Sequence, residues 1–160
     1  MFIYSVRGTT VKLFGVIALA LALLLIFTNL GGDAVLASVA GMEINYGGID
    51  SNDKRVEFIE KMGVKVNPTA KIEESFPVPE SFDRIIAGYN EIQKAQGLDL
   101  TEYHGKRVTH YAYEAVDYDY DGVVYVNLYI HKNRIVGCDV SSMDGAKFVK
   151  PLVGSEHKTK

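Results

Sequence analysis

The sequence predicts an α+β domain, with two helices packed on an antiparallel sheet of about three to five strands, preceded by a single N-terminal transmembrane helix. Three observations lead to this fold class: an uncharged apolar run over residues 13–32, apolar side chains at helical spacing over 79–97, and alternating side chains over 122–131. The chain has 160 residues, of which 48% are hydrophobic and 23% charged, as is usual for a folded protein. One domain with an appendage accounts for this length.

The apolar run at residues 13–32 has the length of a membrane span. Its twenty residues contain no charged side chain, and at a helical rise of about 1.5 Å they reach roughly 30 Å, the thickness of a hydrocarbon core. Arg7 and Lys12 precede the run, and residues 1–12 contain no acid. Because positive charge stays on the cytoplasmic side, we expect a single-pass cell-membrane protein with a cytoplasmic N-terminus and an extracytoplasmic region over 33–160.

A cleaved signal peptide is the alternative to a retained anchor. The run from Leu13 to Phe27 has the length of a signal-peptide core, and Ser38-Val39-Ala40 resembles a cleavage site with small residues. Ala40 lies thirteen residues after Phe27, which is farther than such sites usually lie, and this favours the anchor. Both alternatives predict that the folded domain is exported.

The charge of the exported part excludes one class of partner. Residues 33–160 carry all 20 acidic residues and 15 of the 17 basic ones, so their formal net charge is −5. We therefore expect no binding to nucleic acid. Residues 153–160 contain lysines near the chain end and are expected to form a flexible tail. The single cysteine, Cys138, has no partner for an internal disulfide and is expected to be a buried, inert thiol.

The first half of the exported part contains a linker, a helix and short strands. The stretch from Gly31 to Ser51 has glycine pairs near both ends, so residues 33–49 are expected to be a linker, followed by the domain at 50–152. Asp50 or Ser51 is a candidate cap for a helix that Gly63 ends. Its apolar face contains Val56, Ile59 and Met62. Two strands are expected next, a short one in "VKV" and an edge strand in "KIEESF" between prolines.

The clearest element is the helix predicted over residues 79–97. Pro79 suits a first turn, and Gly97 suits the left-handed stop. We expect its apolar side chains to face the sheet, because a small domain must bury its amphipathic helices. The apolar stripe consists of Phe82, Ile85, Ile86, Tyr89 and Ile92.

Three consecutive runs, 106–118, 122–131 and 134–142, predict an antiparallel meander. In the middle run Val124, Val126, Leu128 and Ile130 alternate with Tyr125, Asn127, Tyr129 and His131. The first set predicts a core face, and the second predicts a wet or aromatic face. Lys132-Asn133 separates the second and third runs, and asparagine tolerates the positive φ of a tight hairpin turn.

The joint between the first two runs reads "DYDYDG", residues 117–122, and resembles the start of a calcium loop. A helix-loop-helix calcium site needs an acidic residue at position 128, where this chain has a leucine, and a helix where the pattern predicts a strand. Asp121-Gly122 is a common hairpin pair, so we expect a tight turn. A loose cation site built from Asp117, Asp119 and Asp121 remains the weaker alternative, and no cofactor is expected.

Candidate catalytic and binding residues are few. Cys138, His110 and Asp139 are the residue types of a thiol hydrolase, but no sequence spacing brings them together, and the faces that Cys138 and His110 occupy stay open. The four histidines show no metal-ligand spacing. We therefore expect no catalytic residue. Seven of the ten tyrosines lie between Tyr103 and Tyr129, which makes Tyr125 and Tyr129 the candidate binding residues on an aromatic sheet face.

Three blocks of the sequence resemble the bacterial family known as Domain of Unknown Function 4830, whose members follow an N-terminal membrane helix. The blocks begin at "RVEFIEKMGVKV", at "VPESFDRIIAGYNEIQKAQGLDLTEYHG" and at "VYVNLYIHKNRIVGCDVSS", and the resemblance covers roughly residues 50–148. A glycine is usual in the family where Cys138 stands, a cysteine is common near Ser141, and the pattern differs around Ala146-Lys147, which argues against a role for Cys138. The resemblance implies an exported, anchored domain and supplies no activity. Its most specific residues are Tyr89-Asn90, Gln93-Lys94, Gln96-Gly97, Asp99-Leu100, Tyr103 and Gly105.

These observations favour a non-enzymatic function. We expect a membrane-anchored extracytoplasmic binding or regulatory module that contacts the membrane through residues 13–32 and a protein or envelope partner through its domain. A small envelope hydrolase or a metal-dependent enzyme is the alternative from another class. A third alternative is an inhibitor-like domain of exported proteases, which rests on fold analogy.

Overall fold

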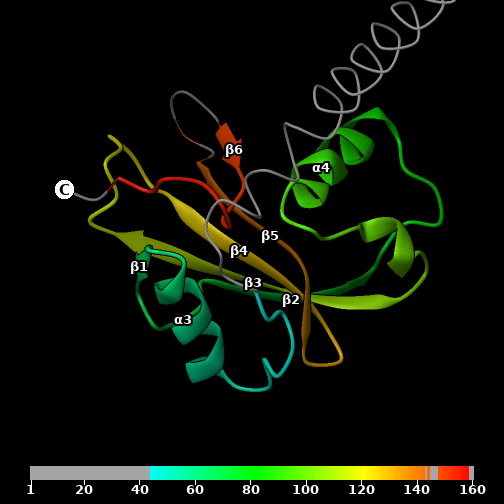
Figure 1. Cartoon of the computed structure of the whole chain (residues 1–160), viewed down its shortest axis with the longest axis horizontal. Coiled ribbons are helices and arrows are strands. Elements are labelled where there is room, and N and C mark those ends of the chain that lie inside the picture. Colours follow the sequence, from blue (N-terminus) through cyan, green and yellow to red (C-terminus); the bar gives the residue numbers. More distant parts are fainter. Residues whose placement is uncertain (1–43, 143, 145–147, 159–160) are drawn as a thin grey trace, which may run out of the picture.

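The computed structural model describes residues 44–142, 144 and 148–158, and these form an α+β fold with two helices and a six-stranded antiparallel sheet (Figure 1). The elements are α3 (Asn52–Lys61), β1 (Lys65–Val66), β2 (Ile72–Pro77), α4 (Arg84–Lys94), the 3-10 helix η1 (Leu100–Tyr103), β3 (Arg107–Val116), β4 (Tyr125–His131), β5 (Arg134–Ser142) and β6 (Phe148–Lys150). Within the described part of the chain, no helix is long and apolar enough to cross a membrane. The span predicted at residues 13–32 lies outside that part.

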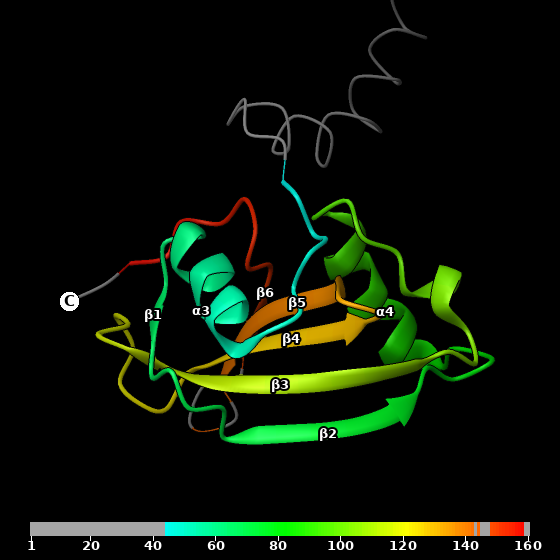
Figure 2. The same cartoon turned by 90° about the horizontal axis from the view of Figure 1, so that it is seen from below.

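The sheet contains the predicted meander and extends it on both sides. β3, β4 and β5 are consecutive antiparallel neighbours, β1 and β2 both pair with β3, and β6 pairs with β5. The edge strand predicted in "KIEESF" is confirmed as β2. The sheet has one strand more than the upper limit of the prediction because β6, which is only three residues long, has too little alternation to be recognised. Figure 2 shows α3 across one face of the sheet and α4 beside β5.

The two hairpins of the meander differ from each other. Lys132 and Asn133 have φ values of 45° and 62°, which confirms the tight turn between β4 and β5. The tight turn predicted at Asp121-Gly122 is wrong, because β3 ends at Val116 and β4 begins at Tyr125, with an irregular loop between them. The backbone N–H of Val123 in this loop donates to the Asp144 carboxylate at 2.8 Å. A side chain from the β5–β6 connection thus replaces a local turn bond.

Helix α3 begins and ends as its sequence predicts. The Ser51 hydroxyl accepts a hydrogen bond from the Lys54 N–H at 3.3 Å, and Gly63 follows the helix at φ 87°. Phe58 and Ile59 are buried against the sheet. Residues 44–49, at the end of the expected linker, also contact the domain: the N–H of Ile135 donates to the carbonyl of Tyr46 at 2.9 Å, and Tyr46 is buried.

Helix α4 corrects the prediction in two ways. It begins at Arg84, because the Asp83 carboxylate accepts hydrogen bonds from the first N–H groups at 2.8 and 2.9 Å, so Pro79 lies before the helix. Its inward positions are polar: Asn90 and Gln93 are buried, while Ile85 is 81% exposed. Of the expected apolar stripe, Phe82 and Tyr89 pack against the core, whereas Ile85 does not, and Asn90 and Gln93 take inward positions instead. The interactions of the buried amides explain this arrangement and are described below.

The hydrophobic core lies mainly between the sheet and the layer formed by α3 and residues 44–49. A smaller cluster of Val78, Leu100, Val108 and Val136 lies near α4 and η1. The fully buried members of the main core include Ile59, Val64, Tyr113, Val126, Leu128, Ile135, Cys138, Val140 and Leu152.

Candidate functional site

The register of the strands assigns each candidate residue to one face of the sheet, because directly opposite residues project to the same side. We call the side covered by α3 the α3 face, and the other side, which α4 and η1 cover in part, the open face. Leu128 lies opposite Cys138 and belongs to the core, which places Cys138 on the α3 face. Tyr129 lies opposite His110, and Asn127 lies opposite Asp139, which places these four residues on the open face.

The three residue types of a thiol hydrolase are therefore not brought together. Cys138 is fully buried on the α3 face, whereas His110 and Asp139 project from the other side of the sheet. Burial raises the pKa of the Cys138 thiol well above its usual range. The thiol contacts the side-chain oxygen of Gln96 at 3.3 Å. His110 cannot act as a base for this thiol, because the sheet separates them.

A buried polar network occupies the open face around Asp139, which is only 2% exposed. The Tyr89 hydroxyl of α4 donates to one carboxylate oxygen at 2.6 Å, and the Asn127 amide donates to the other at 2.8 Å. The same amide nitrogen donates to the Ser141 hydroxyl at 2.8 Å. Burial raises the pKa of Asp139, and the hydrogen bonds from Tyr89 and Asn127 oppose this shift.

His110 extends the network to the edge of the sheet. Its Nε2 lies 2.9 Å from the Asn127 side-chain oxygen, and because that oxygen accepts, we assign the proton to Nε2. Its Nδ1 lies 3.3 Å from a carboxylate oxygen of Glu74 on β2. The imidazole stacks on the Tyr129 ring with centroids 4.7 Å apart. The network thus connects β2, β3, β4 and β5 with α4.

The two candidate binding tyrosines share the open face but have different surroundings. Tyr129 packs against Phe76, Tyr89 and His110, and burial raises its pKa to about 12. Tyr125 is half-buried and lies directly opposite Glu114 on one side and Ser141 on the other. Tyr129 is therefore engaged in packing, and Tyr125 is the more accessible ring.

Exposed apolar side chains surround Tyr125. Val149 lies opposite Ser141 and therefore shares its face, and Val116 shares the face of Glu114 by alternation. The Ala115 N–H donates to the carbonyl of Val124 at 2.8 Å, which continues the pairing and places Val123 beside Val116. These three valines are 41–43% exposed. We call Val116, Val123, Tyr125 and Val149 the valine–tyrosine patch.

The aspartates of "DYDYDG" line the loop next to this patch. Asp117, Asp119 and Asp121 are all exposed, and Asp117 has a φ of 59°. Among the residues that the structure describes, no group of three or more His, Cys, Asp or Glu side chains could hold a metal ion. Asp144 accepts hydrogen bonds from the Ser142 hydroxyl and the Val123 N–H, and these bonds lower its pKa.

Two buried glutamines, Gln93 of α4 and Gln96 just after the helix, close the outer edge of β5, and sequence reasoning did not predict this role. The Cys138 N–H donates to the Gln93 side-chain oxygen at 2.8 Å, and the Gln96 amide donates to the Cys138 carbonyl at 2.9 Å. The side-chain oxygen of Gln96 also accepts from the N–H groups of Leu152 and Val153 at 2.8 and 2.9 Å. The amides thus take the place of a neighbouring strand beyond the end of β6.

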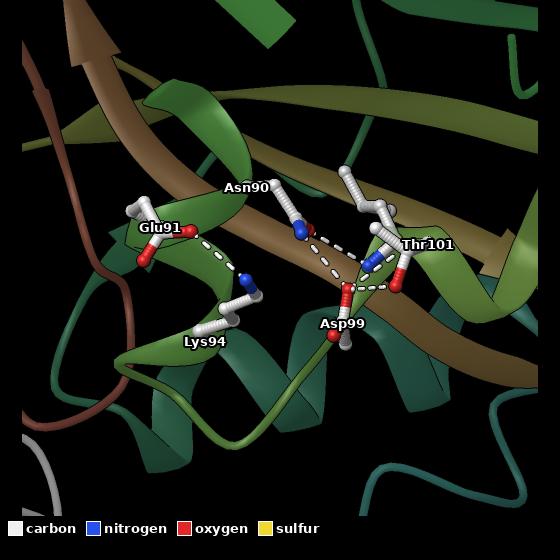
Figure 3. A network of polar contacts seen from close by, with 6 residues as sticks. Asn90, Glu91, Lys94, Asp99 and Thr101 are labelled. Atoms are coloured by element: carbon white, nitrogen blue, oxygen red, sulfur yellow. Dashed lines mark hydrogen bonds and ion pairs between the residues drawn. The ribbon is translucent and has the colours of Figure 1, made fainter. Parts of the chain in front are cut away.

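A second polar group fixes the segment after α4 (Figure 3). The Asn90 amide donates to the Asp99 carboxylate at 2.8 Å, and its oxygen accepts from the Leu100 N–H at 2.8 Å. The Thr101 hydroxyl and N–H also donate to Asp99, at 2.7 and 2.9 Å. The hydrogen bond from Asn90, followed by that from Thr101, lowers the pKa of Asp99 to about 2. Figure 3 also shows the Lys94–Glu91 ion pair of 2.9 Å on the exposed side of α4.

A pocket of about 560 Å³ lies on the opposite side of the molecule from the network, between residues 44–49 and α3. Phe58 and Ile49 contribute apolar surface to it, and Lys54 and Lys61 lie at its wall. Lys61 is paired with Glu57 at 2.7 Å. Among the described residues that line it, there is no histidine, cysteine, serine or threonine that could act as a nucleophile or base.

Comparison with known proteins identifies a family. The model of the family described as "Domain of unknown function (DUF4830)" matches residues 58–140, which is more than half of the chain. No curated protein and no solved structure matches. The most specific residues of this resemblance, from Tyr89 to Gly105, lie in α4, in η1 and in the segments that follow them, and some of them contact β5. The chain belongs to the DUF4830 family.

Proposed function

We propose that this chain is a membrane-anchored extracytoplasmic recognition module that binds a protein partner through the valine–tyrosine patch and catalyses no reaction. The observation that carries the proposal is the position of the exposed valines around Tyr125. Single exposed apolar side chains are normal on a protein surface, but a group on one sheet face is typical of an interaction site. A tyrosine ring at its centre offers a large contact area at little entropic cost.

The sequence before the domain supports the location. The uncharged run at residues 13–32 has the length of a membrane anchor, and the positive charges before it favour an external domain. Residues 33–43 separate this run from the first described residue, Ile44. Eleven residues can extend over at most about 36–40 Å. A domain on such a tether would stay close to the membrane and meet partners of the same compartment.

The polar residues support recognition over catalysis. Cys138 is fully buried and the sheet separates it from His110, and the Asp139 carboxylate is held by Tyr89 and Asn127 below the surface. His110 is held between Asn127 and Glu74. Each of these groups has a structural partner, and no nucleophile stands within reach of a base in this set. Such a network is suited to fixing the sheet face that carries Tyr125.

Site-specific cross-linking in intact cells tests the proposal. A photoreactive benzoylphenylalanine replaces Tyr125 in the full-length protein, and a matched control carries it at Glu60, an exposed position on α3. We expect a discrete protein adduct from position 125 that is absent from position 60. Val149→Asp should remove the adduct, because a charge in the patch opposes apolar contact. Equal adducts from both positions, or none from position 125 in a folded protein, would contradict the proposal.

A further inference from the structure

The valine–tyrosine patch is bordered by carboxylates. Glu114 lies directly opposite Tyr125, and Asp117 directly follows Val116. Asp121 lies two residues before Val123, and the Asp144 carboxylate accepts the Val123 N–H. The acidic rim, as we call it, consists of Glu114, Asp117, Asp121 and Asp144.

Few described basic groups offset the acidic rim. Lys71 pairs with Glu114 at 3.4 Å. Lys65 lies opposite Val116 on β1, so its exposed side chain projects from the same face and borders the patch. The rim therefore keeps an excess of negative charge around an apolar centre.

We propose that the partner at this patch is a protein segment with apolar side chains at its centre and lysine or arginine side chains around them. This inference rests on the proposed function and specifies the chemistry of its partner. Charge complementarity steers association and excludes wrong partners, because like charges placed together across an interface cost several kcal/mol. A second copy of the chain would place one acidic rim against another. Nucleic acid and anionic lipid would meet the same repulsion.

The motif "DYDYDG" gains a role in this arrangement. Its aspartates are exposed and do not converge on a metal site. Asp117 and Asp121 lie close to Val116 and Val123 in the chain, so they can receive cationic side chains of a partner whose apolar residues contact the valines. The contacts with the rim determine rate and specificity, and the buried apolar centre determines most of the affinity.

Defined peptides test the charge assignment with the full-length protein in a non-ionic detergent. The probes are a capped hexapeptide alternating lysine with leucine and its counterpart alternating glutamate with leucine. NMR of valine methyl groups reports where each peptide binds. We expect only the lysine peptide to shift Val116, Val123 and Val149. Raising the salt from 50 to 500 mM should weaken its binding about tenfold, because exposed charges are screened.

Charge-neutralising variants give the matched comparison. Asp117→Asn with Asp121→Asn should weaken the lysine peptide about tenfold, whereas Glu60→Gln on α3 should leave it unchanged. Equal shifts from both peptides, or lysine-peptide shifts outside the patch, would overturn the charge assignment. If position 125 still cross-links to a protein in cells, only the proposed partner chemistry is refuted and the recognition site is retained. If that adduct is also absent, the recognition site itself is refuted.

Discussion

Gln96 offers the sharpest test of how α4 is held to the sheet. Its side chain serves four backbone groups at once: the carbonyls of Ile92 and Cys138 and the N–H groups of Leu152 and Val153. Cys138 and Leu152 are almost fully buried, so neither can turn to water when the amide is removed. Gln96→Met preserves the approximate volume and deletes every one of these bonds.

The size of the effect follows from the groups left without partners. A buried donor or acceptor that loses its partner costs about 1–3 kcal/mol. Two such groups, on Cys138 and Leu152, give about 2–6 kcal/mol for Gln96→Met. A domain of this size has a total stability of about 5–15 kcal/mol, so the variant should lose a large part of it. Gln93→Met should cost less, because Gln93 accepts one backbone bond and its own amide nitrogen has no hydrogen-bond partner.

Urea unfolding of the full-length protein, followed by the near-ultraviolet circular dichroism of its tyrosines, measures the difference. We expect a lower midpoint with an unchanged slope for Gln96→Met, a smaller decrease for Gln93→Met, and a change below about 0.5 kcal/mol for Glu91→Gln on the exposed side of α4. A loss below about 1 kcal/mol for Gln96→Met would refute the reasoning. It would show that water or a rearranged backbone satisfies the edge of β5.

Three further predictions concern ionisation, reactivity and turn geometry. Burial raises the pKa of Asp139 above its ordinary 3.8, so the folded state binds this proton more tightly and loses stability as the pH rises from about 4. The free energy of unfolding of Asp139→Asn, measured by urea titration, should therefore increase relative to that of the original protein from pH 4 to pH 7. Cys138 should react with a thiol reagent only at denaturant concentrations that unfold the domain, and rapid labelling of the native protein would contradict its burial. Replacing Lys132-Asn133 by Asn-Gly should raise the free energy of unfolding by about 1 kcal/mol, because both positions have positive φ. A lower urea midpoint than that of the original protein would contradict this.

The β4–β5 hairpin was predictable because its determinants are local. Alternation over residues 124–131 follows directly from the pleat, and Asn133 signals the turn without reference to the rest of the chain. The caps of α3 are local in the same way, since Ser51 and Gly63 act within one turn of the helix. Patterns of this kind predict where strands and helices lie, but they do not identify the hydrogen-bond partners of buried polar groups.

The inner face of α4 was not predictable from its own periodicity. The prediction placed Ile85 in the core, and the structure leaves it exposed while Gln93 and Gln96 are buried. Their burial depends on Cys138, which lies more than forty residues later in the chain. The loop after β3 shows the same dependence, since the Asp144 carboxylate binds Val123 from a distant connection. The local patterns therefore gave wrong predictions where polar contacts between distant parts of the chain determine the structure.

The family motif and the proposed binding patch occupy different parts of the domain. The motif residues between Tyr89 and Gly105 hold α4 and η1 on β5: Tyr89 binds Asp139 on the open face, and Gln96 binds Cys138 at the edge. The valine–tyrosine patch contains none of them and lies toward the beginning of β4. A domain built in this way can keep the contacts of Tyr89 and Gln96 with β5 while the residues around Tyr125 change. Membership in the family therefore predicts the fold of a relative, and the charge and apolar residues beside its β3–β4 loop must be inspected separately to predict its partner.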